Sequence, residues 1–391
     1  MSLLKTLAGW LVALLSSLIP KAPVVVITSM WGYRGGARAF FEAVRDSDVP
    51  WQPVWISLDP EHEQFLNHHS VPFLRYPGWR AAWFILRARW LVSTHGELGR
   101  YKALRGQTYV NLWHGAGMKA DGYLWKPSQG DYYSRTLSRA DVTVAPSPFY
   151  AVIWAAQFHV KAHTIVATGC PHNDLLRDAE AARERLNEIV DGAAYERIFL
   201  YAPSHRQVLS GNTGERESDW TFQDFVDKYL VDDLLAALDL HRALLAIKLH
   251  PNEEKAYGGV VSNLPGGSVR VVTSDSLSAR GLDLYEVLAG FDMLWTDYSS
   301  LATDFILTDR PMVFFCDDLD QYRERRGIVL DRHDLFTPGP RIDSLERLLK
   351  TLERAVADPE YGRDERRFYR RLYQTAEPPY SRNLIRLLLG R

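Results

Sequence analysis

Cysteines and metal-binding motifs are scarce in this chain of 391 residues. The two cysteines, Cys170 and Cys316, lie far apart and form no CxxC pair, which argues against a disulfide framework and a cysteine-based zinc site. HExxH motifs, EF-hand loops and compact His/Asp clusters are also missing. We therefore expect no metal, no cofactor and a cytoplasmic compartment, unless scattered residues converge on a metal site in the fold.

Net charge and long apolar runs are lacking as well. A formal net charge of -2 gives no overall basic field, so nucleic acid is not an expected partner and any polyanion would need a local patch. The apolar stretch from Leu7 to Ile19 is shorter than the roughly 20 residues of a bilayer-crossing helix. No small-x-small cleavage site precedes Pro20, which disfavours a secretion signal.

The first 21 residues instead show helical spacing of their apolar side chains. These side chains are Leu3, Leu4, Leu7, Trp10, Leu11, Leu14, Leu15 and Leu18. The polar residues fall mainly on another side, a pattern typical of an amphipathic helix that lies in a membrane surface. The alternative is a terminal helix packed on its own domain or on a dimer partner.

From Lys21 onward, short apolar runs alternate with amphipathic stretches, as in parallel sheets covered by helices. The first series of expected strands is 24–28, 54–58, 90–93, 108–112, 142–145 and 164–167. The second series is 197–201, 244–249, 269–273, 293–296 and 312–315. Because one core seldom serves 391 residues, we predict an α/β protein with two doubly wound domains.

The break between the two series is the charge-rich helical stretch 174–191. We place an N-terminal domain at 22–170 and a C-terminal domain at 171–391, after the helix at 1–21. Two such domains in tandem would turn the carboxyl ends of their strands toward each other across a cleft, and ligands bind at such ends.

Four polar clusters fall where expected strands end. The first follows Val110 and contains Trp113, His114, Gly115 and Lys119. A histidine before Gly-x-Gly can face a substrate while the backbone turns sharply, and imidazole titrates near physiological pH. His114 is therefore a candidate general base. The alternative is a histidine that is simply hydrogen-bonded at the end of a strand.

The second and third clusters supply cations. Arg206, in the stretch YAPSHR, can clamp phosphate oxygens with paired N–H donors, unless it is an ordinary surface arginine. Lys248 lies in an apolar run, where burial is costly without an anion or a carboxylate partner. Lys248 or its neighbour His250 is thus expected to face a charged group, although an exposed edge strand would also explain Lys248.

The fourth cluster is TDYSSLATDF, residues 296–305. Asp297 ends a strand, and Ser299 and Ser300 are expected to cap the next helix. Hydroxyl groups and free N–H groups at a helix start form an anion site, whereas the plainer interpretation is an ordinary N-cap. Asp304, one turn later, is expected to hold a partner in place instead of touching a ligand.

Together the clusters put cationic donors and a phosphate site in the second domain and a base in the first. This combination suits transfer of a group from an activated nucleotide with a diphosphate to a hydroxyl group. One domain would supply the base, and the other would stabilise the charge of the leaving group.

Nine ordered motifs between about residues 105 and 340 resemble those of the CDP-glycerol glycerophosphotransferase family, the teichoic-acid primases and polymerases. They are WHG (113–115), GCPHND (169–174), YAPSHR (201–206), KLHP (248–251), DLYEVL (283–288), TDYSSLATDF (296–305), DRPMVFF (309–315), DLDQYRERRG (318–327) and PGP (338–340). The resemblance implies GT-B architecture, with two facing Rossmann-like domains. It also implies transfer of glycerol phosphate or ribitol phosphate from a CDP-alcohol donor to a lipid-linked saccharide acceptor, with release of CMP.

The resemblance also assigns roles to single residues. It implies that His114 is the base acting on the acceptor hydroxyl, with His250 and Asp297 as further catalytic residues. The residues expected to bind or polarise the donor diphosphate are Arg206, His250, Ser299 and Ser300, with Asp297 placing their loop. The other expected substrate contacts are Trp113, Gly115, Lys119, Lys248 and Arg326.

Departures from the family pattern leave the polyol and the acceptor open. After WHG the family often has Thr-Pro-Leu-Lys-Lys, whereas this chain has AGMKA at 116–120, so we expect a looser turn. Where the family commonly has Thr-Trp-Arg, this chain has Ser-His-Arg at 204–206. Its length favours the shorter, primase-like members over the long polymerases.

A lipid-linked acceptor must be met at the bilayer surface. We therefore expect a peripheral or monotopic protein on the cytoplasmic face of the cell membrane, held there by its amphipathic start. Aromatic and basic residues at 79–90 also suit an interface, unless they form a helix with a solvated basic face. Two other functions stay open: a nucleotide-sugar glycosyltransferase of the same architecture, and a catalytically silent membrane scaffold that binds nucleotide.

Overall fold

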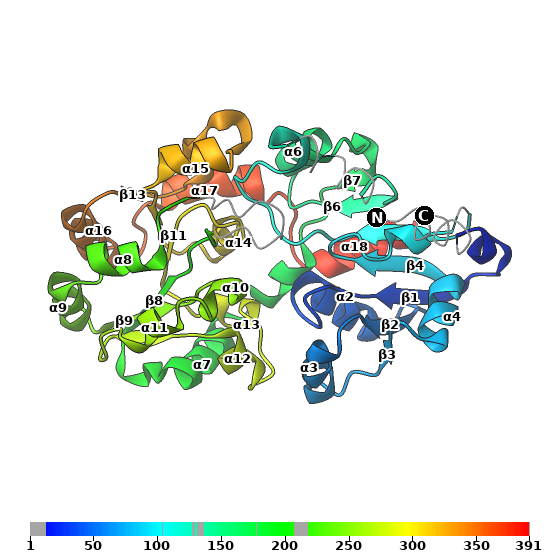
Figure 1. Ribbon diagram of the computed structural model, residues 1–391, viewed down its shortest axis with the longest axis horizontal. Coiled ribbons are helices and arrows are strands. Elements are labelled where there is room, and N and C mark those ends of the chain that lie inside the picture. The colour runs from blue at the N-terminus through cyan, green and yellow to red at the C-terminus, as the bar shows by residue number, and fades with distance from the viewer. Residues whose placement is uncertain are drawn as a thin grey trace. The chain divides into compact units, whose positions relative to one another are not determined.

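The computed structural model describes residues 13–103, 105–126, 130, 137–176, 178–206 and 218–390. The chain divides into two units (Figure 1). Unit 1 comprises residues 1–114, 121–175 and 373–391, and unit 2 comprises residues 115–120 and 176–372. Of the amphipathic helix predicted at 1–21, residues 1–12 lie outside the described part, and residues 13–18 are helical.

Unit 1 contains a seven-stranded parallel sheet with the order β3-β2-β1-β4-β5-β6-β7. Its strands are β1 (Ala22–Ile27), β2 (Gln52–Ser57), β3 (Phe73–Arg75), β4 (Ala88–Ser93), β5 (Thr108–Asn111), β6 (Val142–Val144) and β7 (Ile165–Val166). The strand order reverses between β1 and β4. In doubly wound sheets, ligands bind at the carboxyl ends of the strands at such a reversal.

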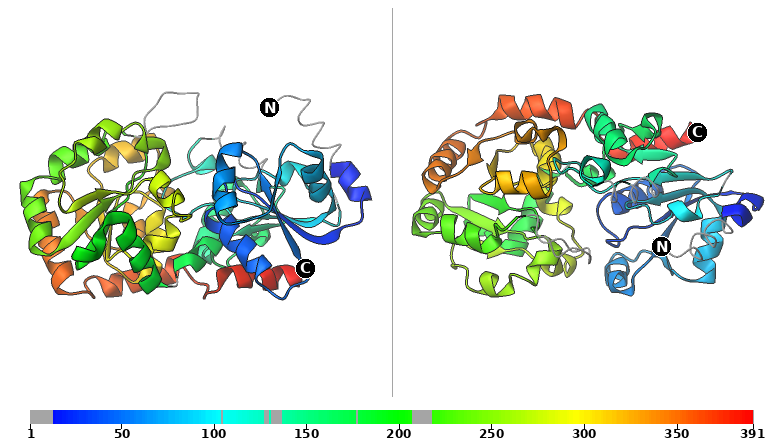
Figure 2. Two further views of the ribbon diagram at one scale, coloured as in Figure 1. Left: turned by 90° about the horizontal axis from the view of Figure 1, so that it is seen from below. Right: turned by 45° about the horizontal axis from the view of Figure 1, so that its top comes forward.

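Helices cover both faces of this sheet (Figure 2). Val25 and Ile27 of β1 pack with α2 (Gly35–Arg45) and α18 (Tyr380–Leu389). The intervening Val24 and Val26 pack with α4 (Trp79–Arg87) instead, because successive side chains of a strand point to opposite faces. The remaining helical segments are α3 (Glu63–His68), α6 (Pro148–Phe158), η1 (Pro60–His62), η2 (Gly99–Tyr101), η3 (Gly122–Leu124), η4 (Ala162–Thr164) and η5 (Pro171–Leu176).

Unit 2 contains a six-stranded parallel sheet with the order β10-β9-β8-β11-β12-β13, which reverses between β8 and β11. Its strands are β8 (Arg197–Tyr201), β9 (Ala243–Ile247), β10 (Val269–Val271), β11 (Met293–Thr296), β12 (Met312–Phe315) and β13 (Arg341–Ile342). One face packs on α8 (Phe222–Tyr229), α9 (Asp232–Leu240) and α16 (Leu345–Ala357).

The other helices that begin in unit 2 are short, except α7 and α17. They are α7 (Ala179–Val190), α10 (Pro251–Glu254), α11 (Gly258–Ser262), α12 (Ser274–Ser278), α13 (Tyr285–Leu288), α14 (Leu301–Phe305), α15 (Leu319–Arg325), α17 (Arg363–Tyr373), η6 (Gly192–Ala194), η7 (Ile306–Thr308), η8 (Val329–Asp331) and η9 (His333–Phe336).

The predicted α/β fold is confirmed in both units, and each expected strand has an observed counterpart. Strands β3 and β13 were missed, because each has only two or three residues and lies at a sheet edge. The observed units differ from the predicted ranges 22–170 and 171–391 at residues 115–120, which belong to unit 2, and at residues 171–175 and 373–391, which belong to unit 1. Within the described part of the chain, no helix combines the length and apolar character needed to cross a bilayer.

The Asp174 carboxylate helps to hold the last helix in unit 1, and this attachment can be tested. Asp174 accepts hydrogen bonds from the backbone N–H groups of Tyr380 and Ser381, both at 2.8 Å. We expect Asp174→Ala to lower the free energy of unfolding by about 1–2 kcal/mol, because the first turn of α18 loses its acceptor. Urea denaturation measures the change. Asp48→Ala, at an exposed aspartate, is the control, and equal stability of the two variants would contradict the anchoring role.

Candidate active site

His114 lies in unit 1, three residues after β5. Its ring stacks on that of His95, with centroids 3.9 Å apart and an interplanar angle of 9°. Surrounding protein atoms, and secondarily His95, lower the pKa of His114, although the residue keeps an exposed surface. A neutral imidazole has a nitrogen that can accept a proton, as the predicted base requires.

Trp113 is a packing anchor for the loop that carries His114. It is buried, at 5% exposure, and its ring lies 4.8 Å from the Phe158 ring. Its backbone adopts a φ of 55° and is held by a 2.9 Å hydrogen bond from its N–H group to Asn111 Oδ1. A bulky side chain seldom adopts this left-handed conformation, so the surroundings must enforce it. This buried position differs from the predicted substrate contact.

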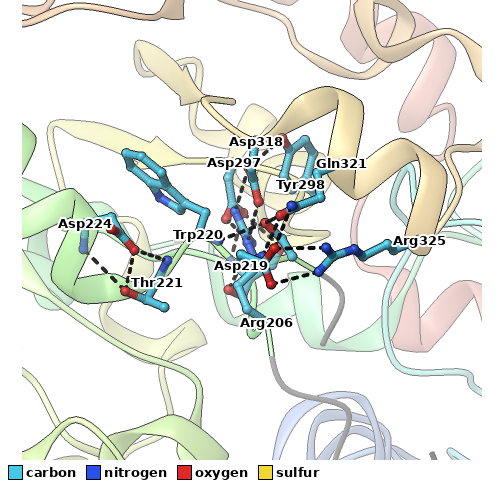
Figure 3. A network of polar contacts seen from close by, with 12 residues as sticks. Arg206, Asp219, Trp220, Thr221, Asp224, Asp297, Tyr298, Asp318, Gln321 and Arg325 are labelled. Carbon is cyan, nitrogen blue, oxygen red and sulfur yellow. Dashed lines mark hydrogen bonds and ion pairs between the residues drawn. The ribbon is translucent and has the colours of Figure 1, made fainter. Parts of the chain in front are cut away.

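Arg206 lies at the centre of a buried ion cluster in unit 2 (Figure 3). Its guanidinium donates to Asp297 Oδ2 at 2.6 Å and to Asp318 Oδ2 at 3.0 Å, and lies 5.0 Å from the centre of the Tyr298 ring. Burial by itself would lower the pKa of Arg206, but the two carboxylates raise it well above its ordinary value. Arg206 therefore joins the loops after β8, β11 and β12, instead of clamping phosphate as predicted.

Asp297 holds the loop that follows β8. Its Oδ1 atom accepts hydrogen bonds from the backbone N–H and the hydroxyl group of Ser204, both at 2.8 Å. Burial acts to raise the pKa of Asp297, but Arg206 and the Ser204 hydrogen bonds outweigh it, and the net pKa is lowered. A permanently charged Asp297 agrees with its predicted role of placing the loop.

Lys248 has its charged partner within unit 2. Its Nζ atom lies 2.6 Å from Glu254 Oε1 and 3.2 Å from Ser274 Oγ, and the residue is buried. The predicted need for a carboxylate is thus met inside the protein and not by a substrate. His250 is partly exposed, and its ring centroid lies 4.6 Å from that of His205. The loops after β8 and β9 therefore bring two imidazoles together.

Residues 115–120 pack against the start of α14. A Cβ atom on Gly115 would lie 2.9 Å from Ser300 Oγ, and one on Gly117 would lie 3.1 Å from Ser300 Cα. Glycine at these positions allows an approach that a larger residue would obstruct. The turn that was predicted to be loose is therefore closely packed.

The same segment is tied to residues 326–329 on its other side. Ala120 donates its N–H to the Gly327 carbonyl at 3.1 Å, and Arg326 donates to the Ala120 carbonyl. Arg326 is buried, so the structure gives it a bracing position instead of the predicted substrate contact. Lys119 is partly exposed, with its Nζ atom 5.8 Å from the centre of the Tyr322 ring. It remains a candidate phosphate contact.

The two serines of the fourth cluster differ in their bonding. Ser299 Oγ accepts a 3.3 Å hydrogen bond from the Leu301 N–H group, whereas Ser300 makes no side-chain capping bond. Ser300 therefore occupies the predicted N-cap position of α14 without a capping bond from its side chain. Both residues are partly exposed. Buried Asp304 accepts from the Tyr285 hydroxyl at 2.8 Å, as expected of a residue that holds a partner.

His95 and Asp318 were not singled out from the sequence. His95-Gly96 begins two residues after β4 ends, and His114-Gly115 begins three residues after β5 ends, so the same signal identifies both histidines. Asp318 has no such signal, because its role depends on the fold bringing it to Arg206. Among the described residues, no group of three or more His, Cys, Asp or Glu side chains could hold a metal ion.

The buried ion cluster predicts a large difference between two arginines. Arg206→Ala should destabilise the protein by about 3–5 kcal/mol, because it leaves two buried carboxylates without their cation. Arg325→Ala removes an exposed arginine that pairs with Asp219 at 2.9 Å and should leave the urea midpoint unchanged. Because the folded-state pKa of Asp297 is lowered, its pairing stabilises above pH about 4 and is lost in stronger acid. The difference in the free energy of unfolding between the wild type and Arg206→Ala should therefore shrink in stronger acid. Similar urea midpoints for Arg206→Ala and Arg325→Ala at pH 7 would refute the assignment.

Several known proteins are similar to this chain. The chain is similar to the teichoic acid glycerol-phosphate transferase of Staphylococcus aureus, with 27% identity over 87% of this chain and 85% of that protein. It is 24% identical to a teichoic acid poly(glycerol phosphate) polymerase of Bacillus spizizenii over 90% of this chain and 88% of that protein. In fold it resembles a CDPG-soaked variant of the wall teichoic acid polymerase TagF (TM-score 0.76, 18% identity, 99% and 93% coverage).

A family model supplies the assignment. The model of CDP-glycerol:poly(glycerophosphate) glycerophosphotransferase matches residues 12–390. That match includes all nine motifs on which the resemblance was based. The chain therefore belongs to the CDP-glycerol:poly(glycerophosphate) glycerophosphotransferase family, within the group of enzymes that make teichoic acids.

Proposed function

We propose that this enzyme transfers glycerol phosphate from CDP-glycerol to a hydroxyl group of a lipid-linked acceptor and releases CMP. The supporting observation is the close packing of Gly115 and Gly117 on Ser300. This packing fixes the residue after His114 to the segment following β11, at the strand reversal of unit 2.

The proposed chemistry is one displacement at phosphorus. His114 takes the proton of the acceptor hydroxyl. At the same time, the oxygen of that hydroxyl bonds to the phosphorus that carries glycerol. The bond from that phosphorus to the bridging oxygen breaks, and CMP leaves with the bridging oxygen. Lys119, Ser299, Ser300 and His250 would hold the phosphate oxygens, because charge on these oxygens is what a phosphoryl-transfer site stabilises. No cofactor enters this balance.

Activity measurements with a defined acceptor test the proposal. CDP-glycerol should give CMP and a product heavier by glycerol phosphate, and His114→Asn should lower kcat by about 10²–10⁴-fold. The donor KM should change little, because this base acts on the acceptor. Activity of the wild type should fall in acid as His114 gains a proton, on a limb below pH about 6.5, since its pKa is lowered.

The controls and competing donors complete this experiment. His163→Ala, at an exposed histidine of η4, should retain full activity. CDP-ribitol and a panel of UDP-sugars are tested in parallel, and product mass distinguishes a single addition from a polymer. Release of UDP alone would indicate sugar transfer instead of glycerol-phosphate transfer. Full activity of His114→Asn would show that His114 is not the base.

A surface of unit 1 supports the membrane part of the proposal. Residues 13–18 lie beside the end of α4, because Ser16 Oγ and Lys21 Nζ both donate to the Leu86 carbonyl, at 3.1 and 2.6 Å. The large apolar side chains exposed on these two helices are Leu14, Leu15, Leu18, Trp79 and Trp83, with Trp79 at 80% exposure. We call these five residues the apolar patch.

Arginines border the apolar patch. Arg80 and Arg87 are exposed, and the Arg87 guanidinium lies 5.4 Å from the centre of the Trp83 ring. Exposed tryptophan next to arginine suits the boundary between acyl chains and anionic headgroups. We therefore propose that unit 1 meets the cytoplasmic face of the membrane here.

Vesicle flotation tests the apolar patch. The double variant Trp79→Ala/Trp83→Ala should bind vesicles that contain anionic phospholipid at least about tenfold more weakly, because two large apolar side chains no longer leave water. Its activity on a soluble acceptor analogue should stay near that of the wild type. Leu240→Ala removes an apolar side chain of unit 2 that is 78% exposed, and it should bind as the wild type does. Unchanged flotation of the double variant would refute this membrane contact.

A further inference from the structure

The strand reversal of unit 1 carries a second histidine, which the proposed chemistry does not use. His95 follows β4, and Trp31 follows β1, the neighbouring strand at the reversal (Figure 1). Trp31 donates its indole N–H to His95 Nε2 at 3.1 Å, and His95 Nδ1 lies 2.8 Å from Thr94 Oγ1. Both ring nitrogens of His95 therefore have partners.

These contacts select one tautomer of His95. Because an indole N–H can only donate, His95 Nε2 must accept and carry no proton. In the neutral ring the proton then lies on Nδ1 and is donated to Thr94 Oγ1, whose own proton is directed to Ser29 Oγ at 3.1 Å. Protonation of His95 would put two donors against each other at the Trp31 contact. Glu97 Oε1 lies 3.8 Å from His95 Nδ1 and would favour a charged ring, but burial lowers the pKa of His95 to about 4 and keeps the ring neutral.

The loops that carry these groups are joined by one carboxylate. Glu97 accepts from the backbone N–H groups of Met30 and His95, both at 2.7 Å. This bridge ties the segment after β1 to the segment after β4. His95 is consequently fixed by its backbone as well as by its ring.

The fixed ring of His95 covers one face of the His114 ring. The two imidazoles are nearly parallel, with centroids 3.9 Å apart. The Trp113 ring also contacts His114, with centroids 4.3 Å apart and an interplanar angle of 36°. His95 cannot itself replace His114 as a base, because its unprotonated nitrogen is already bonded to Trp31. A flat, neutral neighbour can instead restrict the plane in which the His114 ring lies.

Several charged groups act on His114. Glu97 and Asp121 raise its pKa, as does a hydrogen bond with the Thr94 backbone, whereas the surrounding protein and His95 lower it. Without the His95 ring, water would also reach the face of the His114 ring that His95 covers, and the carboxylates would favour the protonated form of His114.

We propose that His95 is a positioning residue for His114. Held in one tautomer by Trp31 and Thr94, its ring fixes the plane of the His114 imidazole and keeps water from one of its faces. This inference rests on the proposed function in that His114 is the base whose orientation matters.

Two readouts on four variants test the proposal. NMR titration of isotope-labelled histidine, with His114 assigned by loss of its signal in His114→Asn, reports the pKa of His114 without any substrate. His95→Ala should raise that pKa by at least about one unit, and should lower kcat about 10- to 100-fold with the KM for CDP-glycerol unchanged within about twofold. The acidic limb of kcat should move to higher pH.

His95→Phe is the conservative variant, because it keeps a flat ring without nitrogen atoms. It should keep kcat within about threefold of the wild type and leave the pKa of His114 low. His163→Ala is the matched control for the loss of an exposed histidine, and thermal unfolding checks that each variant is folded. If His95→Ala leaves the His114 titration unchanged, or if His95→Phe is as impaired as His95→Ala, stacking does not position His114.

The two readouts also separate this proposal from the proposed function. A raised His114 pKa in His95→Ala supports positioning even if His114→Asn retains activity, which would remove the role of base alone. An unchanged pKa overturns positioning even if His114→Asn is inactive.

Discussion

One guanidinium between two carboxylates determines where the loops of unit 2 lie. Arg206, Asp297 and Asp318 come from the ends of β8, β11 and β12, and all three are buried. Each of these charges would be costly to bury without the others. The loops can therefore adopt few arrangements other than the one that closes the cluster, and the exposed residues beside them, Ser299 and Ser300, inherit that fixed position.

The close packing of two glycines provides the second constraint on the structure. Gly115 and Gly117 lie against Ser300, and Arg326 holds the carbonyl at the far end of their segment. There is little room for a Cβ atom between this segment and Ser300, and Ala120 pairs with the backbone of Gly327. The residue that follows His114 is thus built into unit 2, although His114 itself belongs to unit 1.

The sequence predicted the fold well because its signal is local and repeated. Short apolar runs located the central strands, whereas β3 and β13 are too short to show a period. The path of the chain was harder to predict: nothing in residues 373–391 by themselves shows that α18 packs on α2 in unit 1. The return of the chain to unit 1 depends on contacts between residues far apart in the sequence, such as the hydrogen bond between Tyr380 and Asp174.

The site was predicted by position more accurately than by role. Four clusters at strand ends were found because the residue types there are unusual, whereas His95 and Asp318, which follow β4 and β12, were not. Burial could not be read from the residue types. Arg206, Lys248 and Arg326 look like phosphate contacts in the sequence, and each is buried with partners inside unit 2. Trp113 was misassigned for the same reason.

The internal pairing of these three cations changes the expected electrostatics of phosphate binding. A diphosphate that met several unpaired cations would be held tightly before and after the reaction, which lowers KM without raising kcat. The groups proposed to hold the phosphate oxygens, which are Lys119, two serine hydroxyl groups and the imidazole of His250, would form a weaker, more dipolar set. Dipoles fixed by buried ion pairs need little rearrangement as charge moves to the leaving oxygen, and such preorganisation favours the transition state over the bound donor. The buried cations would then serve catalysis by immobilising the groups around them, without touching phosphate.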